Sequence, residues 1–254
     1  MLATYDLKGK RALITGGASG IGLGAVQAFL RCGASVAVND LADDRLTAVV
    51  DELAGAGHAV VAAPGDVGNP EQAPAMVAQA VAALGGLDYL VNNAGTPGTA
   101  RPIATDDFER QDEDFWQLLV NVNLVGPHRC TRAAAEALRA TGGAIVNTTS
   151  IAAFRGGGSS AVYCATKAGL VSLTREWARA LAPQVRVNAI APGLVDSDWM
   201  CRFDGQDDAV RMGQPVPLGR TGTPTDYGEA ILFLAAGATY VTGQTLNVDG
   251  GLTT

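Results

Sequence analysis

The chain is poor in the residues that build disulfides and metal centres. It has four cysteines with no C-x-x-C pair, and two histidines with no second histidine or cysteine at ligand spacing. These residues are Cys32, Cys130, Cys164, Cys201, His58 and His128. We therefore expect neither a disulfide framework nor a bound metal. Scattered cysteines are typical of proteins in a reducing compartment, which predicts a cytoplasmic location.

Basic runs and long apolar runs are absent as well. The 254 residues carry a net charge of −7, which disfavours nonspecific binding to nucleic acid or to an anionic membrane. The longest stretch without charge, 230–248, is interrupted by glycines and polar residues and does not predict a membrane helix. The first residues lack the layout of a signal peptide. We expect a soluble protein that acts on a small molecule and has neither a nucleic-acid nor a membrane partner.

Short β-branched runs alternate with longer helical stretches along the whole chain. This pattern predicts a doubly wound parallel sheet of the Rossmann type, with about seven strands and helices on both faces. We expect one nucleotide-binding domain over 1–254, with the substrate loop near 194–214. The expected strands are Arg11–Thr15, Ser35–Asn39, Ala59–Ala63, Leu87–Asn92, Ala144–Thr148, Val185–Ala189 and Thr245–Val248, and the expected helices lie near 20–31, 43–55, 71–84, 106–140, 160–181 and 224–235.

A glycine-rich loop follows the first expected strand. Its sequence is TGGASGIG, with Gly16, Gly20 and Gly22 spaced as G-x-x-x-G-x-G. Glycines allow a tight turn and let backbone N–H groups approach a phosphate at the start of the next helix. This spacing differs from the common G-x-G-x-x-G fingerprint. The prediction of phosphate binding therefore rests on the position of the loop between an expected strand and an expected helix.

Asp40 ends the second expected strand, SVAVN. A carboxylate at this place can accept hydrogen bonds from the two hydroxyls of an adenosine ribose, and it repels a 2′-phosphate. Residues Gly17, Ala18 and Ser19 of the loop include no cation that could bind that phosphate. Arg45, further along the chain, is an alternative phosphate partner. Asp40 therefore predicts NAD as the cofactor, in preference to NADP.

Taken together, the motifs resemble those of the short-chain dehydrogenase/reductase family, in its compact single-domain branch. The resemblance extends over nearly the whole chain. Each motif is weak alone, but seven in order are specific: TGGASGIG at 15–22, NNAG at 92–95, VNL at 122–124, IVNTTS at 145–150, Y-x-x-x-K at 163–167, APG at 191–193 and VDGG at 248–251.

The resemblance implies four catalytic residues. Tyr163 would be the general base in alcohol oxidation and the acid in ketone reduction, and Lys167 would hold the nicotinamide ribose. Ser150 would hydrogen-bond the substrate oxygen, and Asn123 would anchor a relay of water molecules. A free tyrosine has a pKa near 10, and an ammonium one helical turn away favours the phenolate. We therefore expect Lys167 to lower the pKa of Tyr163.

The resemblance also implies the cofactor site and the assembly. Asp66 and Val67 would flank the adenine, Asn93 the adenosine side, and Val195 with Ser197 the nicotinamide amide. A homotetramer is expected, with interfaces at the helix 160–181 and the last strand. The full set of expected NAD-binding residues is Gly16, Ser19, Gly20, Ile21, Gly22, Asp40, Leu41, Asp66, Val67, Asn93, Ala94, Gly95, Tyr163, Lys167, Pro192, Gly193, Val195 and Ser197.

The favoured function is NAD-dependent interconversion of a secondary alcohol and its ketone. A sugar or polyol, a cyclic alcohol and a hydroxy acid all remain open as substrates. The alternatives are a 3-oxoacyl-(acyl-carrier-protein) reductase, which generally uses NADPH, and a nucleotide-sensing scaffold without turnover. An epimerase or dehydratase would usually need a longer C-terminal substrate portion. We expect the substrate pocket to be formed by residues 151–160, the loop after NNAG and residues 194–214. Segment 96–115 is longer and more acidic than the family pattern, and we expect this departure to alter the surface or subunit contacts and not the chemistry.

Overall fold

The centre of the molecule is a seven-stranded sheet in which every pairing is parallel. The computed structural model describes residues 2, 4–196 and 216–254. The strand order is β3-β2-β1-β4-β5-β6-β7, so the chain moves outward from β1 in one direction and then from β4 in the other. This is the doubly wound arrangement, and the predicted fold class is confirmed. The strands are β1 (Arg11–Thr15), β2 (Ser35–Asn39), β3 (Val60–Ala62), β4 (Tyr89–Asn92), β5 (Ala144–Thr148), β6 (Arg186–Pro192) and β7 (Thr245–Val248).

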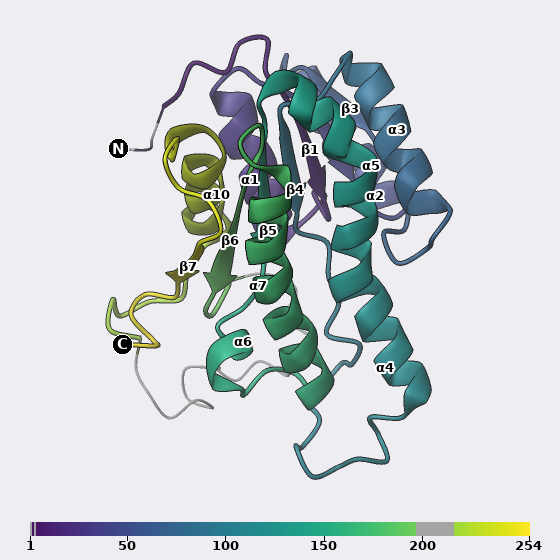
Figure 1. Ribbon diagram of the computed structural model, residues 1–254, viewed down its shortest axis with the longest axis vertical. Helices are drawn as coiled ribbons and strands as arrows, with labels where there is room; N and C mark the ends of the chain where they lie inside the picture. Colours follow the sequence, from purple (N-terminus) through teal and green to yellow (C-terminus); the bar gives the residue numbers. More distant parts are fainter. Residues whose placement is uncertain (1, 3, 197–215) are drawn as a thin grey trace.

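Helices cover both faces of the sheet (Figure 1). Because successive strand residues point to opposite faces, Ala12 and Ile14 of β1 join one core and Leu13 joins the other. The first core is closed by α1 (Gly20–Arg31), α2 (Asp44–Gly55) and α10 (Pro224–Leu232), and the second by α3 (Gln72–Leu84), α5 (Gly126–Thr141) and α7 (Ala161–Leu181).

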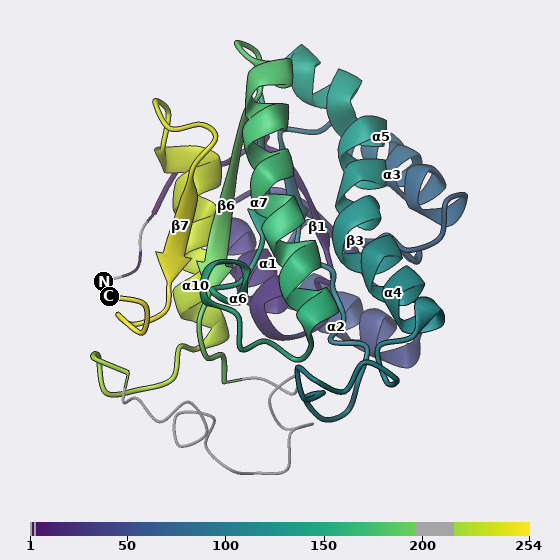
Figure 2. The same ribbon diagram turned by 60° about the horizontal axis from the view of Figure 1, so that its bottom comes forward.

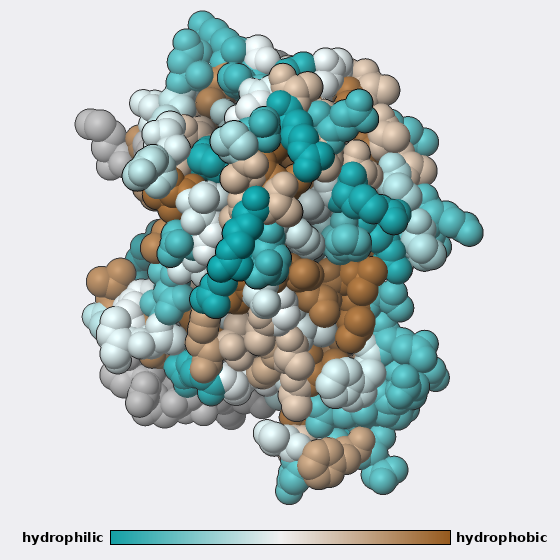
Figure 3. Space-filling model, viewed as in Figure 1, coloured by the Kyte–Doolittle hydropathy of each residue, from teal (hydrophilic) through white to brown (hydrophobic). Residues whose placement is uncertain are grey.

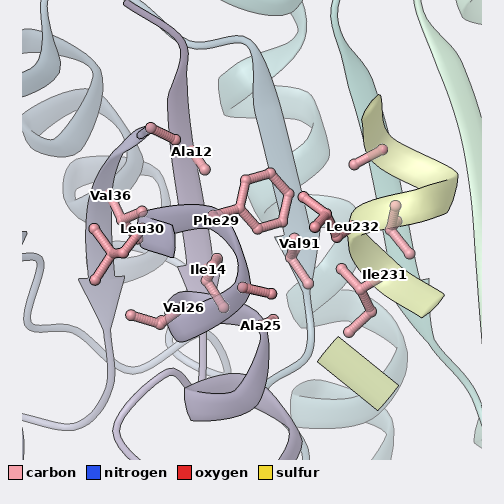
Figure 4. Packing of buried hydrophobic residues seen from close by; sticks show 14 of the residues in the cluster. Ala12, Ile14, Ala25, Val26, Phe29, Leu30, Val36, Val91, Ile231 and Leu232 are labelled. Atoms are coloured by element: carbon pink, nitrogen blue, oxygen red, sulfur yellow. The ribbon is translucent and has the colours of Figure 1, made fainter. Parts of the chain in front are cut away.

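Helices α1 and α10 approach each other closely over the first core. Figure 4 shows Phe29 of α1 and Leu232 of α10 above the strands that carry Ile14 and Val91. A Cβ atom on Gly24 of α1 would lie only 2.2 Å from the backbone oxygen of Pro224. Glycine at this crossing therefore lets two distant parts of the chain pack together and fixes the start of α1 beneath the glycine loop.

The helix expected at 106–140 is in reality three elements. It begins at α4 (Glu113–Val120), where the Asp112 side chain accepts a hydrogen bond from the Phe115 amide and caps the helix. A π-helical turn, η1 (Asn121–Val125), then separates α4 from α5. The prediction of helix over 106–112 is wrong, because this stretch folds as turns that end at the Asp112 cap.

The other elements differ from the expected ranges mainly at their ends. Strands β3 and β4 are shorter than predicted, while β6 continues to Pro192. A short helix, α6 (Ala152–Arg155), follows β5 and was not predicted, and α10 continues as a second π-helical turn, η2 (Phe233–Gly237). Among the described helices, none is both long enough and apolar enough to span a bilayer.

Candidate active site

A cleft of about 520 Å³ lies at the carboxyl ends of the strands. It contains the predicted cofactor residues of the described chain with the exception of Gly22, and it contains Ser150, Tyr163 and Lys167. Ser197 and most of the expected substrate loop lie outside the described residues. The lining residues are Gly16, Ser19, Gly20, Ile21, Asn39, Asp40, Leu41, Arg45, Gly65, Asp66, Val67, Asn93, Ala94, Gly95, Thr96, Pro97, Leu118, Val122, Thr148, Thr149, Ser150, Tyr163, Lys167, Pro192, Gly193 and Val195.

The glycine loop forms one end of the cleft. Gly16 and Gly20 have φ angles of +62° and +51°, a region that other residues rarely adopt. A Cβ atom on Gly22 would lie 1.9 Å from the Gly16 oxygen, so Gly22 packs against the loop while Gly20 faces the cleft. Helix α1 begins at Gly20, and the Ser19 side chain does not cap it. The loop and the uncapped helix start together form a site that suits a phosphate.

Asp40 lies beside this loop, and its carboxylate is held by two backbone amides. Oδ2 accepts a hydrogen bond from the Ala18 N–H at 3.1 Å, and Oδ1 accepts one from the Leu41 N–H at 2.9 Å. Each carboxylate oxygen keeps a further lone pair for a ligand hydroxyl. Arg45 also lines the cleft, although its guanidinium lies 3.7 Å from Asp43 and its side chain is half exposed. The negative charge of Asp40 is therefore fixed in place at the cleft wall.

Asn93 connects the glycine loop to β5. Its Nδ2 donates to the backbone oxygens of Thr15 and Gly16 at 3.0 and 3.1 Å, and its Oδ1 accepts from Thr148 Oγ1 at 3.2 Å. Gly95, two residues later, leaves room for two side chains, because a Cβ there would lie 3.2 Å from Asn123 Oδ1 and 3.5 Å from Lys167 Nζ. The NNAG segment thus joins the phosphate end of the cleft to the end that holds Lys167.

Asp66 and Val67 line the cleft next to Asp40, whose backbone oxygen accepts a hydrogen bond from the Gly65 N–H. The Asp66 carboxylate accepts a hydrogen bond from the Gly68 N–H at 2.8 Å, which closes a tight turn. The turn is held from outside by Arg129 of α5, whose guanidinium donates to the backbone oxygens of Val67 and Gly68 at 3.4 and 3.0 Å. Sequence reasoning missed Arg129, because it lies far from this turn along the chain.

Tyr163 and Lys167 extend from the first two turns of α7. The Lys167 ammonium is buried, donates to the Thr148 backbone oxygen at 2.9 Å and lies 5.7 Å from the centroid of the Tyr163 ring. Burial lowers the pKa of Lys167 to about 8, so the ammonium form predominates at neutral pH. Burial raises the pKa of Tyr163 to about 12, although a hydrogen bond with the Ser150 side chain acts to lower it. The expectation of a lowered tyrosine pKa is therefore wrong for the protein alone, because desolvation outweighs the neighbouring groups.

Asn123 lies in η1 behind the cleft and does not line it. It is fully buried, and its side-chain amide pairs with the backbone of Thr96: Oδ1 accepts from the Thr96 N–H at 2.8 Å, and Nδ2 donates to the Thr96 oxygen at 2.9 Å. The Thr96 backbone is thus fixed from behind while the residue itself lines the cleft. This arrangement gives Asn123 a structural function, which is compatible with the expected relay.

The β6 end completes the cleft with Pro192, Gly193 and Val195. The Gly193 N–H donates to the Val248 oxygen of β7, and a Cβ on Gly193 would lie 2.8 Å from the Asp249 Cα atom. The APG and VDGG motifs are therefore in direct contact, although more than fifty positions separate them in the sequence.

Several cleft residues were not predicted from the sequence. Thr96 and Pro97 were not named as site residues, although they belong to the loop after NNAG that was expected to form part of the substrate pocket, and both line the cleft. The position of Pro97 directly after NNAG and Thr96 was the available signal. The other residues missed are Asn39, Gly65, Leu118, Val122, Thr148 and Thr149. Within the described ranges, no cluster of three or more His, Cys, Asp or Glu side chains has the geometry of a metal site.

Comparison with known proteins agrees with this fold. Residues 16–253 match a family model described as enoyl-(acyl carrier protein) reductase. The chain is 37% identical to a 3-oxoacyl-(acyl-carrier-protein) reductase of Chlamydia pneumoniae, over 97% of this chain and 98% of that protein. The chain belongs to the short-chain dehydrogenase/reductase family, and it is an oxidoreductase of that kind.

Two solved structures illustrate the cofactors found among similar proteins. A 3-ketoacyl-(acyl-carrier-protein) reductase from Brucella melitensis complexed with NADH has a TM-score of 0.86 and 32% identity, and the match covers 96% of this chain and 98% of that one. A short-chain dehydrogenase from Burkholderia cenocepacia in complex with NADP has a TM-score of 0.87 and 32% identity, over 97% and 99%. Similar proteins therefore bind either nicotinamide cofactor.

Proposed function

We propose that this protein is an NAD-dependent dehydrogenase that interconverts a secondary alcohol and its ketone. The observation that supports the cofactor choice is Asp40, whose carboxylate is fixed at the cleft wall by the Ala18 and Leu41 amides. A 2′-phosphate about 4 Å from this charge would meet a repulsion on the order of 1–4 kcal/mol, depending on screening. The glycine loop suits the pyrophosphate, because Gly22 lets the loop pack tightly on itself while Gly16 and Gly20 line the cleft without side chains.

The bound nicotinamide supplies the hydride acceptor or donor. In oxidation, the hydrogen on the carbinol carbon leaves with the two electrons of its bond, as hydride. The hydroxyl proton passes to Tyr163 Oη, and Ser150 hydrogen-bonds the substrate oxygen. In reduction, Tyr163 returns its proton to the oxygen that becomes the alcohol. Lys167 would hold the ribose and present its ammonium to the tyrosine. Asn123 keeps Thr96, and through it the wall of the cleft, in place.

The charges in the cleft show what each direction requires. Bringing Tyr163 from a pKa of about 12 to near 7 requires about 7 kcal/mol. The Lys167 ammonium lies 5.7 Å from the ring centroid, and a single charge at a separation of this order supplies only a few kcal/mol, about 3 at an effective dielectric constant of about 20. Tyr163 therefore needs a second positive charge to serve as a base near neutral pH, where Lys167 still holds its proton. As an acid for ketone reduction, the phenol is already in the correct form.

The cofactor experiment compares NAD with NADP in the unaltered protein and in two variants. We expect higher kcat/KM with NAD, and we expect Asp40→Ala to narrow the difference mainly by admitting NADP. Asp40→Asn keeps a similar shape and removes the charge, so it separates repulsion from loop geometry. Equal efficiency with the two cofactors in the unaltered protein would contradict the proposal.

The catalytic experiment is Tyr163→Phe, which removes the proton-transferring hydroxyl and keeps the ring. Turnover should fall at least about a hundredfold, the lower end for loss of general acid–base catalysis, while NAD affinity changes little. Lys167→Met should reduce both turnover and cofactor affinity, and the double variant should lose less than the sum of the two effects. Substantial turnover by Tyr163→Phe would refute the mechanism. A scaffold without turnover would show NADH binding but no reaction in any substrate panel.

A second candidate is reduction of a 3-oxoacyl thioester. The observation that favours it is the 37% identity to a reductase of this activity over nearly the full length of both chains. A similar ketoacyl reductase has been solved with NADH bound. A site that prefers NAD therefore does not argue against this reaction. Assays of an acetoacetyl thioester with NADH, beside NAD reduction by polyols, cyclic alcohols and hydroxy acids, would decide between the two substrate classes.

We further propose that the protein is a cytoplasmic homotetramer. Figure 3 shows hydrophobic side chains gathered between α7 and the helices α4 and α5, on the face where one interface is expected. The edge strand β7 also exposes Leu246, and Tyr240 near it is fully exposed. Both features support burial against further copies of the chain. The free thiols of Cys32, Cys130 and Cys164 suit a reducing compartment.

A further inference from the structure

The segment between β4 and α4 is bound to the start of the catalytic helix. We call residues 97–111 the β4–α4 loop. The Ile103 N–H donates to the Ser159 oxygen at 2.8 Å, and Ser159 Oγ donates to the Pro97 oxygen at 3.3 Å. The Ala161 N–H donates to Gln111 Oε1 at 3.1 Å. Figure 2 shows the loop next to the N-terminal end of α7.

Gln111 is the residue of this loop whose side chain reaches the helix. Its neighbours Glu109, Arg110 and Asp112 are exposed, whereas Gln111 is only 8% exposed. Its Nε2 donates to the Asp107 oxygen at 3.3 Å, while its Oε1 accepts from Ala161. The site therefore uses one donor and one acceptor of a neutral amide, a pair that a carboxylate or an ammonium cannot supply.

The first turn of α7 depends on side chains for its backbone N–H groups, because the first amides of a helix have no partner within it. Ser160 Oγ accepts from the Tyr163 N–H at 3.0 Å, and Gln111 Oε1 accepts from the Ala161 N–H. These two bonds fix the backbone immediately before and at the tyrosine. The Ser160 cap is local in sequence, whereas Gln111 acts from a loop that lies 50 residues earlier.

We propose that Gln111 is a positioning residue for Tyr163: it fixes the start of α7 so that the tyrosine hydroxyl stays aligned with Ser150. The inference rests on the proposed role of Tyr163. Within the described part of the chain, the groups near the tyrosine include Ser150 after β5, and Cys164 and Lys167 on α7 itself. A shift of the first turn would change the distance from the hydroxyl to each of these groups, and with it the proton transfer.

The test is Gln111→Met, which keeps the side-chain length and removes both hydrogen bonds. Gln117→Met on α4 is the matched control, because Gln117 is exposed. We expect kcat to fall about ten- to a hundredfold in Gln111→Met, as for a small misplacement of a reacting group, with the Kd for NAD unchanged. The apparent pKa in the pH profile of kcat should also move. Gln111→Glu keeps an acceptor for Ala161 and should restore part of the turnover.

A purely structural role would give a different result. If Gln111→Met lowered Tm but kept the kcat and pH profile of the Gln117→Met control, the proposal would be overturned. If Gln111→Met does not fold, the same measurements are made on Gln111→Asn. Its side chain is one methylene shorter, so its amide does not reach both hydrogen-bond partners of Gln111. Tyr163→Phe is measured in parallel. Full activity of Tyr163→Phe would refute the role of Tyr163. If Tyr163→Phe loses activity while Gln111→Met keeps the kcat of the unaltered protein, only the role of Gln111 is refuted.

Discussion

The buried ammonium of Lys167 makes a prediction about stability that needs no substrate. The burial that lowers the pKa of Lys167 from 10.5 to about 8 in the folded protein is lost on unfolding. Between these two pH values the unfolded chain binds one proton more than the folded protein, so stability rises with pH over this window. Below pH 8 both states hold the proton, and the folded protein keeps a buried charge at a cost.

The magnitude follows from the two pKa values. Between pH 7 and pH 10 the contribution of Lys167 to the free energy of unfolding should rise by about 2 to 3 kcal/mol. In Lys167→Met this contribution is absent, so the stability of the unaltered protein relative to the variant should increase by that amount. Lys167→Met also removes the hydrogen bond to the Thr148 oxygen. Below pH 8 this loss changes the difference in free energy of unfolding between the two proteins by the same amount at every pH, and it does not reverse the direction of the pH dependence.

The assay is urea denaturation of both proteins at pH 7, 8, 9 and 10. The raised pKa values of Tyr163 and Cys130 affect both proteins and largely cancel in the difference. Lys8→Met is the control, because Lys8 is exposed and its loss should give no pH-dependent difference. Parallel stability curves for Lys167→Met and the unaltered protein would refute the buried, depressed ammonium, and with it the described packing of α7 against β5.

Three further predictions concern the cleft and the assembly. Gly22→Ala should lower stability by about 2 kcal/mol or more and weaken NAD binding, because the added Cβ would lie 1.9 Å from the Gly16 oxygen. The control is Gly55→Ala in α2, where nothing lies within 4 Å of an added Cβ. In thermal denaturation this control should be more stable than the unaltered protein by about 0.5–1 kcal/mol. Arg129→Met should weaken NAD binding several-fold in calorimetry with little change in kcat, since it frees the turn at Val67; unchanged affinity would contradict this. Light scattering at micromolar concentration should give a tetramer, and a monomer would exclude that assembly.

Features that depend on nearby residues could be predicted from the sequence. The alternation of strands and helices gave the fold class, because each short buried strand needs cover on both faces. The glycine loop, Asp40 and the Tyr163–Lys167 pair were also predicted, since each is defined by its place after a strand or by one turn of a helix. The structure brings Gly16 and Gly20 of the loop, Asp40, Tyr163 and Lys167 into the same cleft.

Features that depend on distant residues could not be predicted. The helix expected from residue 106 begins seven residues later, at Glu113, because the Asp112 side chain caps its start by accepting a hydrogen bond from the Phe115 amide. The loop after NNAG was expected to help form the pocket and supplies Thr96 and Pro97 to the cleft, but the contact of Gln111 with the start of α7 was not expected. Nothing in the local pattern of this segment distinguishes Gln111 from its exposed neighbours.

The sequence by itself determined which chemical groups are present and in what order they follow the strands, because backbone geometry translates short spacings directly into neighbouring positions. Only the tertiary structure decided how those groups ionise and how firmly they are held. The pKa of Tyr163 is raised rather than lowered, because the packing of the whole cleft removes water from the phenol. The supports from Arg129, Asn93 and Gln111 arise in the same way, since folding brings together residues that lie tens of positions apart.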